Sequence, residues 1–227
     1  MTVRIVGFGR PSRESLSRDE AVDQGLLIVG VNAHVSPTVR IIPAEDDGSH
    51  FGPVEIGKST IIREHVVLST GTLIGSHVLV GHQCVLRRRV RIGDNSTLSH
   101  LVSVQHDVVI GSRVRISSLT HVTGATIIED DVQIGAGVAT VDDNAMEWPH
   151  PTMLRGPIFR KGCRIGSGST ILGSIEIGHN TFIGAGSVVT RSIPENVIAF
   201  GNPAYIQRDR SPAKPESDEL RRLSEEL

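Results

Sequence analysis

An aliphatic residue returns at every sixth position along most of this chain, and no other feature restricts the fold as much. From Ile56 to Ile134 the series runs without a gap or an insertion. A small or β-branched residue follows each aliphatic one four positions later, from Thr60 to Val138. A helix would give a period of about 3.6 and plain strand alternation a period of about 2, so the pattern indicates a six-residue unit of short strand and turn.

Glycine adds a longer period. A glycine comes directly after every third aliphatic residue of the series, at Gly57, Gly75, Gly93 and Gly111. Three six-residue units then make one triangular coil, with the aliphatic side chains inside and the small ones filling the corners. We expect these glycines to relieve tight turns in which a Cβ would be strained. The pattern predicts an all-β fold, a parallel β-helix of hexapeptide repeats.

The chain divides into three parts on this pattern. Residues 1–26 form an N-terminal segment, residues 27–205 carry the repeat, and residues 206–227 form a linker and a short helix from about Glu216. The repeat is interrupted at about 140–157, by "TVDDNAMEWPHPTMLRGP", and resumes at Phe159. We expect an extruded loop there, and long loops are usually functional or disordered.

Composition excludes several classes of function. The formal net charge is −2 and aromatic residues make up 3% of the chain, so we expect no nucleic-acid partner. No apolar run approaches the roughly 18 residues that span a bilayer, and no secretory signal is evident, so we expect a cytoplasmic protein without a membrane partner. Cys84 and Cys163 fall at the small interior position, where we expect buried structural thiols.

The stretch "IEIGHNTFIGAGSVVTRSIPENVIAFGNPAYIQR" resembles the closing coils of the hexapeptide-repeat acyltransferases. The resemblance implies a left-handed coil and a homotrimer with active sites between adjacent prisms. It also implies acetyl-CoA or another acyl-CoA as co-substrate, with no metal. The matching positions imply cofactor contacts at Ser167, Ala185, Thr190, Arg191 and Arg208, with the basic residues near the CoA phosphates.

His106 is the candidate catalytic base. It lies two positions after an aliphatic residue, outward on a turn, and histidine has a suitable pKa for accepting a proton from an attacking amine or hydroxyl. Its segment "QHDVVIG" resembles the one that carries the base in UDP-N-acetylglucosamine acyltransferases and in sugar-nucleotide N-acetyltransferases. Adjacent side chains on a strand point to opposite faces, so we expect no direct pairing between His106 and Asp107.

Residues separated by three repeats stack on one corner of successive coils, about 4.8 Å apart. Arg88, His106, Gly124 and Asp142 form one such column, in which Arg88 is a candidate for binding a substrate phosphate. His82 and His100 belong to a second column, one coil below Glu64. That column either binds substrate or is a polar ladder.

The loop entrance "TVDDN" departs from galactoside acetyltransferases, which carry their catalytic histidine there. Together with "IIEDDVQIGAGV" it resembles the N-acetyltransferases that act on 3-amino sugar nucleotides. Asp142, Asp143 and Asn144 are therefore candidates for binding the acceptor. The proton can pass to His106, to a loop carboxylate, or leave the substrate amine without a protein base.

The leading hypothesis is a CoA-dependent acyltransferase that N-acetylates an amino-sugar nucleotide. An O-acetyltransferase acting on a sugar or small molecule is the alternative within the class. A zinc enzyme like the γ-carbonic anhydrases is a second class, for which His77 and His82 have the spacing of two ligands but no histidine lies near Ile41. A non-catalytic scaffold is a third. The run "RRRVR" (87–91) either makes ion pairs at a corner or contacts a nucleotide phosphate.

Overall fold

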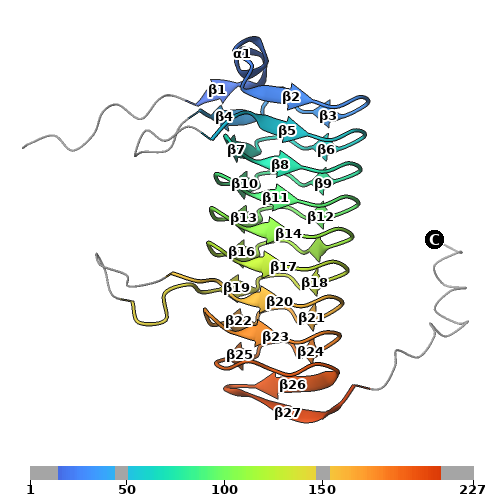
Figure 1. Ribbon diagram of the computed structural model, residues 1–227, viewed down its shortest axis with the longest axis vertical. Helices are drawn as coiled ribbons and strands as arrows, with labels where there is room; N and C mark the ends of the chain where they lie inside the picture. Colours follow the sequence, from blue (N-terminus) through green and yellow to red (C-terminus); the bar gives the residue numbers. More distant parts are fainter. Residues whose placement is uncertain (1–14, 44–50, 147–153, 211–227) are drawn as a thin grey trace, which may run out of the picture.

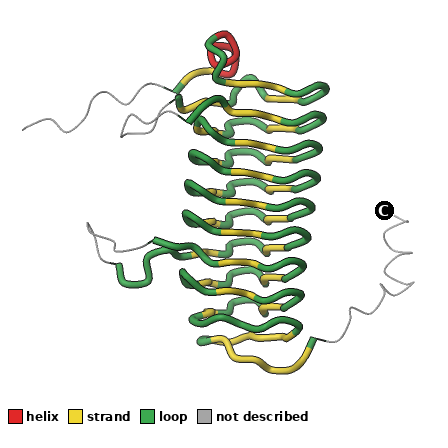
Figure 2. Tube along the Cα trace, viewed as in Figure 1, coloured by secondary structure: helices red, strands yellow, loops and turns green. Residues whose placement is uncertain are grey.

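The computed structural model describes residues 15–43, 51–146 and 154–210, and in this part of the chain short strands form the three faces of a triangular prism (Figure 1, Figure 2). The first sheet contains β1 (Leu16–Ser17), β4 (Arg40–Ile42), β7 (Val67–Ser69), β10 (Val85–Leu86), β13 (Ser103–Val104), β16 (His121–Val122), β19 (Ala139–Thr140), β22 (Thr170–Ile171) and β25 (Val188–Val189). The second contains β2 (Leu27–Val29), β5 (Val54–Ile56), β8 (Leu73–Ile74), β11 (Arg91–Ile92), β14 (Val109–Ile110), β17 (Ile127–Ile128), β20 (Ile158–Phe159) and β23 (Glu176–Ile177). The third contains β3 (His34–Val35), β6 (Ile61–Ile62), β9 (Leu79–Val80), β12 (Thr97–Leu98), β15 (Arg115–Ile116), β18 (Gln133–Ile134), β21 (Arg164–Ile165), β24 (Phe182–Ile183), β26 (Val197–Gly201) and β27 (Ala204–Asp209).

From β2 to β25, consecutive strands lie on successive faces, and each strand pairs in parallel with the strand one coil away. Leu86 pairs with Val104, and Ile92 with Ile110, so one coil consists of three repeats, as predicted. In Figure 1 the second-sheet strands cross the near side from left to right while the chain winds downward, which is a left-handed coil. The fold is therefore the predicted all-β, left-handed parallel β-helix.

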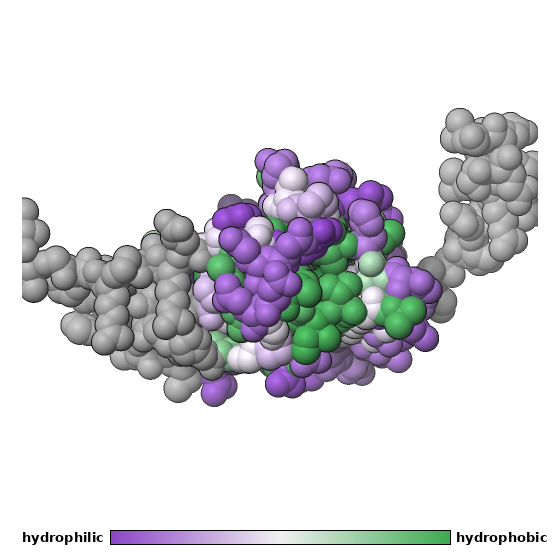
Figure 3. Space-filling view, turned by 90° about the horizontal axis from the view of Figure 1, so that it is seen from above, coloured by the Kyte–Doolittle hydropathy of each residue, from purple (hydrophilic) through white to green (hydrophobic). Residues whose placement is uncertain are grey.

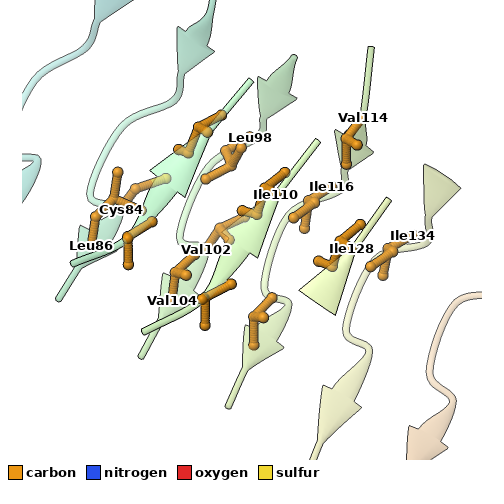
Figure 4. Packing of buried hydrophobic residues seen from close by; sticks show 14 of the residues in the cluster. Cys84, Leu86, Leu98, Val102, Val104, Ile110, Val114, Ile116, Ile128 and Ile134 are labelled. Atoms are coloured by element: carbon orange, nitrogen blue, oxygen red, sulfur yellow. The ribbon is translucent and has the colours of Figure 1, made fainter. Parts of the chain in front are cut away.

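The interior of the prism is the hydrophobic core. All fourteen predicted aliphatic positions from Ile56 to Ile134 are buried, as are the small residues that follow them. Figure 4 shows these side chains meeting inside the coil, with Leu98, Ile116 and Ile134 stacked along the axis. Burying one such side chain contributes about 1.5–3 kcal/mol, so the periodic pattern itself supplies the driving force for the coil.

The turn glycines are needed for a different reason from the predicted one. A Cβ on Gly57 would lie 2.5 Å from the backbone carbon of Gly75, and one on Gly93 would lie 2.6 Å from that of Gly111. Neither residue has a positive φ. The prediction of turn strain was wrong, because the glycines make room for the backbone of the next coil.

The strained backbone position is instead the third residue after each aliphatic one. It has a positive φ whether or not it is glycine, for example 59° at Asn95, 57° at Arg113 and 63° at Leu119. This conformation costs most non-glycine residues about 1 kcal/mol or more, so the packed core must stabilise it. The sequence did not reveal this position, because its side chains share no chemical property.

Both ends of the described coil are closed by other elements. Before the first coil, β1 pairs antiparallel with β4, and α1 (Arg18–Asp23) follows with Ala21 buried. This helix was not predicted, although Ser17 and Glu20 form a capping box that the sequence displays. Seen from above in Figure 3, apolar surface lies beside the hydrophilic surface at this end, where Val31 is 76% exposed.

At the other end β26 and β27 pair antiparallel and continue the third sheet. Residues 206–209, predicted as the beginning of a linker, thus belong to a strand. The helix predicted from about Glu216 lies outside the described residues. No helix in the described ranges is long and apolar enough to cross a membrane.

The chain leaves the coil after β19 and returns at β20. Ile127 pairs with Val109 of the preceding coil and with Ile158 of the following coil. The coil from Ile127 to Ile158 contains more residues than the coil from Val109 to Ile127, because it includes the loop. After the loop, β20 pairs with β17 in the second sheet. The repeat would put its next strand in that same place if there were no loop.

Candidate active site

Apart from Arg208, the predicted site residues lie at two of the three corners of the prism. The His106 corner, between the first and second sheets, carries Arg88, His106, Gly124 and Asp142, and further along it Thr190 and Arg191. The His100 corner, between the third and first sheets, carries Glu64, His82, His100 and Ser118, and further along it Ser167 and Ala185. The Asp94 corner, between the second and third sheets, carries Ser76, Asp94, Ser112 and Asp130.

His106 and Asp107 are in direct contact, contrary to the prediction. Nδ1 of His106 lies 3.0 Å from Oδ2 of Asp107. The strand β13 ends at Val104, so both residues lie in the turn, and Asp107 has a φ of 63°. The rule that adjacent side chains diverge holds only on an extended strand, and the left-handed backbone at Asp107 brings its carboxylate back to the imidazole.

Arg89 holds the Asp107 carboxylate from the coil above. The guanidinium makes two hydrogen bonds to it, of which Nη2 to Oδ2 measures 2.7 Å. The hydrogen bonds from Arg89, and to a smaller extent from His106, lower the pKa of Asp107 below its usual value. Asp107 is therefore an anion at neutral pH and holds the imidazole proton on Nδ1, which leaves Nε2 as a free lone pair.

The Cε1–Nε2 edge of the His106 ring lies close to Gly124. A Cβ placed on Gly124 would lie 3.0 Å from Cε1 and 3.3 Å from Nε2 of His106, and 3.4 Å from Oδ2 of Asp142. The imidazole and the Asp142 carboxylate thus both pack close to Gly124, which leaves room for them because it has no side chain. The predicted column is confirmed as a spatial cluster of His106, Gly124 and Asp142.

Arginine and an aromatic ring lie next to the base. The guanidinium carbon of Arg88 lies 5.7 Å from the centroid of the Phe51 ring, and that of Arg89 lies 4.5 Å from it. Arg87 donates from Nη1 to Oε1 of Gln105 at 3.2 Å. The sequence gave no reason to select Phe51, because it lies outside the periodic positions. Within the "RRRVR" run, Arg87 and Arg89 bind side chains of the next coil, while the Arg88 guanidinium lies near the Phe51 ring.

The loop entrance is held by its own polar side chains. The Asn144 amide donates to the carbonyl of Gly173 at 3.0 Å and accepts from its N–H at 2.8 Å, as a paired strand residue would. Oδ1 of Asp143 accepts from the backbone N–H groups of Ala145 and Met146. These contacts assign Asn144 and Asp143 to positioning the loop. Contact of either residue with the acceptor stays a prediction.

The His100 corner contains a second pair of a carboxylate and an imidazole. Oε2 of Glu64 lies 2.8 Å from Nδ1 of His82. The His82 and His100 rings are stacked with centroids 4.9 Å apart, and the backbone N–H of His82 donates to Nδ1 of His100 at 3.1 Å. Because Nδ1 of His100 accepts this hydrogen bond, neutral His100 carries its proton on Nε2.

The contact made by His100 recurs at other turns of the prism. Asp94 accepts from the N–H of Ser76 at 2.7 Å, and Ser167 accepts from that of Ala136 at 3.1 Å. A side chain two positions after an aliphatic residue thus satisfies a backbone N–H of the coil above. Ser167 and His100 have this structural role, and their predicted contacts with cofactor or substrate are additional to it.

The other predicted cofactor residues are exposed near the C-terminal end of the described coil. Ala185 and Thr190 lie on turns, and Arg208 lies on β27. The guanidinium carbon of Arg191 lies 4.7 Å from the centroid of the Tyr205 ring. Tyr205 is 53% exposed and was not selected from the sequence, although an exposed aromatic beside a basic residue is a surface on which a flat ring can stack.

The zinc alternative finds no ligand set in the described residues. His77 belongs to the turn between β8 and β9, on the Asp94 corner, whereas His82 lies on the His100 corner. No three histidine, cysteine or carboxylate side chains in the described ranges are grouped as metal ligands. One chain therefore does not bring the two predicted ligands together.

Comparison with known proteins agrees with this fold. Residues 156–191 match the family described as Bacterial transferase hexapeptide (six repeats). A UDP-N-acetylglucosamine acyltransferase structure from Bacteroides fragilis superimposes with a TM-score of 0.61 at 15% identity, covering 80% of this chain and 70% of that one. The Arabidopsis UDP-N-acetylglucosamine acyltransferase gives 0.59 at 18% identity, covering 87% and 67%. These structures show the fold, and the predicted resemblance to hexapeptide-repeat transferases is confirmed.

Curated relatives match over shorter stretches. A serine acetyltransferase from Buchnera aphidicola is 50% identical over 52 residues, which is 23% of this chain and 19% of the relative. A galactoside O-acetyltransferase from Lactococcus lactis is 50% identical over 44 residues, 19% of this chain and 21% of the relative. The chain thus spans about a fifth of the length of these relatives.

Proposed function

We propose that the protein is an acyltransferase that uses acetyl-CoA and that its chemistry takes place at the His106 corner. The observation that carries the proposal is the Arg89–Asp107–His106 chain of contacts, which leaves Nε2 of His106 as the proton acceptor. A base oriented by a carboxylate is what acyl transfer to an amine or hydroxyl requires. The matches to acetyltransferases support the choice of acyl donor.

In this mechanism Nε2 of His106 accepts the proton of the acceptor nitrogen or oxygen as that atom attacks the thioester carbonyl. The carboxylate of Asp107 stabilises the resulting imidazolium, as an ionised partner on Nδ1 does in other carboxylate–histidine pairs. When the carbon–sulfur bond breaks, the imidazolium returns the proton to the CoA thiolate. The products are the acetylated acceptor and CoA with a free thiol.

We further propose that the acceptor is an amino-sugar nucleotide. The Asp142 carboxylate lies near Gly124 together with His106, where it can bind an amine, and Arg88 occupies the same corner one coil before His106, where it can bind a phosphate. An acceptor with both a primary amine and a phosphate would use both groups. Ser167, Ala185, Thr190, Arg191 and Arg208 are proposed to contact CoA.

The test is an acetyl-transfer assay with a panel of acceptors. The purified protein is incubated with acetyl-CoA and UDP-amino sugars, serine or galactosides, while thiol release is followed and products are identified by mass spectrometry. We expect release with an amino-sugar nucleotide and a loss of about 10²–10⁴-fold in His106→Ala. A His106→Ala variant with unchanged turnover would contradict the assignment of the base and favour a substrate amine that loses its own proton.

O-acetylation is the second candidate, because both relatives described above transfer to a hydroxyl-bearing compound by name. Thiol release with serine or a galactoside, and none with any amino-sugar nucleotide, would support this candidate. Absence of thiol release with every acceptor would contradict acyl transfer as a whole.

A further inference from the structure

The Phe51 ring lies at the start of a series of contacts that ends at His106. The guanidinium carbon of Arg89 lies 4.5 Å from the centroid of this ring. The same guanidinium donates two hydrogen bonds to the carboxylate of Asp107, whose Oδ2 lies 3.0 Å from Nδ1 of His106. Residues from three separate parts of the chain, before β5, after β10 and after β13, therefore form one continuous series.

The turn after β7 holds Phe51 in this place. The N–H of Gly71 donates to the carbonyl of Gly52 at 3.0 Å. A Cβ on Gly71 would lie 2.6 Å from Cβ of Phe51 and 3.0 Å from its carbonyl oxygen, and Gly71 has a φ of 77°. Only a residue without a side chain fits here, so glycine allows the backbone of Phe51 to approach the corner on which Arg89 lies.

The pair of Arg89 and Asp107 has a counterpart on the Asp94 corner. Arg113 donates from Nε and Nη2 to the carboxylate of Asp131, at 2.6 and 3.0 Å. All four residues have φ values between 57° and 63°, and each pair joins the same turn position of successive coils. The double hydrogen bond is therefore a recurring element of these turns, and it forms with or without a histidine beside it.

The two corners differ in the group that gives the arginine a further contact. On the Asp94 corner, Nη2 of Arg113 also donates to Oδ2 of Asp130 at 3.2 Å. His106 occupies the corresponding place in its own turn, and an imidazole is not a second anion for Arg89. The Phe51 ring supplies a contact to Arg89 instead.

This contact matters because ion pairs at a protein surface are weak. The side chains of Arg89 and Asp107 are 43% and 35% exposed. Such a pair contributes little by itself, because water screens it and two flexible side chains must be held in one geometry. An aromatic face attracts a cation and excludes water from one side of it, which strengthens the hydrogen bonds that the cation makes.

We propose that Phe51 is a positioning residue of the active site. Its ring fixes the guanidinium of Arg89, which fixes the carboxylate of Asp107, which in turn keeps the proton of His106 on Nδ1. Phe51 thus acts on the base through two other side chains. The effect on catalysis rests on the proposed function, whereas the tautomer of His106 is measured without any substrate.

Nitrogen NMR of the imidazole tests the positioning directly. Protein with ¹⁵N-labelled histidine is compared as wild type, Phe51→Leu and Phe51→Tyr at alkaline pH, and the His106 signals are identified by their loss in His106→Gln. We expect His106 to be protonated on Nδ1 in the wild type and to be a mixture of both tautomers in Phe51→Leu. Phe51→Tyr should restore the wild-type signals, because tyrosine keeps the aromatic face. An unchanged tautomer in Phe51→Leu would overturn the proposal.

Phe182→Leu is the matched control for the loss of an aromatic ring. Phe182 is 37% exposed and lies on β24 of the third sheet, which does not border the His106 corner. We expect its His106 signals to equal those of the wild type. Equal changes in Phe182→Leu and Phe51→Leu would show a general loosening of the coil and would also overturn the proposal.

Steady-state kinetics tests the consequence for catalysis. We expect Phe51→Leu to lower kcat by about three- to tenfold, the size of a cation–π contact, with KM for both substrates nearly unchanged. In an Arg89→Lys background, which lacks the double hydrogen bond, Phe51→Leu should have almost no further effect. A fully additive loss, or a rise in KM with unchanged kcat, would show that Phe51 acts by another route.

The two measurements separate the positioning role from the proposed function. If the wild-type protein transfers no acyl group, the proposed function fails, and the nitrogen spectra still decide whether Phe51 fixes the imidazole. If the wild-type protein is active and the His106 signals of Phe51→Leu equal those of the wild type, the positioning role fails and the proposed function stands.

Discussion

Nδ1 of His106 and Oδ2 of Asp107 are 3.0 Å apart although the two residues are neighbours in the chain. The contact depends on the left-handed backbone of Asp107, whose φ is 63°. An aspartate on an extended strand would point to the opposite face. The same carboxylate accepts two hydrogen bonds from Arg89. The turn therefore supplies an anion, Asp107, and the preceding coil supplies the cation that binds it, Arg89.

Substituting Asp107 tests this contact. We expect Asp107→Asn to lower kcat/KM by about 10–100-fold, because an amide neither stabilises the imidazolium nor fixes its tautomer as a carboxylate does. Asparagine tolerates a positive φ, so the turn should be preserved. Steady-state kinetics measures the effect. In a His106→Ala background the same substitution should have almost no further effect, and a fully additive loss would show that Asp107 acts independently of His106.

Adding a methyl group at residue 124 should lower the activity of the protein without unfolding it. The new Cβ of Gly124→Ala would lie 3.0 Å from Cε1 of His106 and would fill the space between Nε2 and Asp142. Because Gly124 has no positive φ, the backbone accepts alanine. We expect a loss of kcat/KM of about tenfold or more, with a melting temperature close to that of the wild type.

Gly93→Ala is the matched control, since its Cβ would lie 2.6 Å from the backbone carbon of Gly111. We expect it to destabilise the fold by about 1–3 kcal/mol, as overpacking usually does. Urea unfolding of both variants separates the two effects. Equal destabilisation by both substitutions would show that Gly124 serves the coil rather than the site.

Acid should remove the stability that Asp107 provides. Its pKa is lowered in the folded state, so its contribution is fully present above its unfolded pKa of about 3.9 and is lost as the pH falls through the folded value. The Asp107 side chain is 35% exposed, so the effect is reduced by solvent. We expect wild type to be more stable than Asp107→Asn near neutral pH, with the difference vanishing in strong acid. A difference that persists at the lowest pH would contradict the role of the ionised carboxylate.

The two cysteines should resist modification while the protein is folded. Burial raises the pKa of Cys163 to about 12 and also raises that of Cys84, so neither forms a thiolate at neutral pH. We expect a chromogenic disulfide reagent to label no thiol in the native protein and both in denaturant. Rapid labelling of the native protein would show that the coil opens at these positions.

Much of the fold was predictable because each interior position repeats the same requirement. Every coil needs an aliphatic side chain at the same three points. The core and the stacking of Arg88, His106 and Gly124 can therefore be predicted from the six-residue period of the sequence. The period did not identify Phe51, Tyr205 or the capping box of α1, because these residues do not occupy repeat positions. It also did not show that Asn144 is bound to the backbone of Gly173, because that contact joins segments on either side of the loop.

The sequence by itself determined the hexapeptide coil, the residues that fill it and the corner on which each polar side chain lies. These properties depend on hydrophobic burial at a fixed period, which is a property of the linear chain. Only the tertiary structure decided which side chains meet. The positive φ of each turn and the close approach of the next coil set the contacts of Asp107 and the need for Gly93, and both arise from the packing of one coil on another.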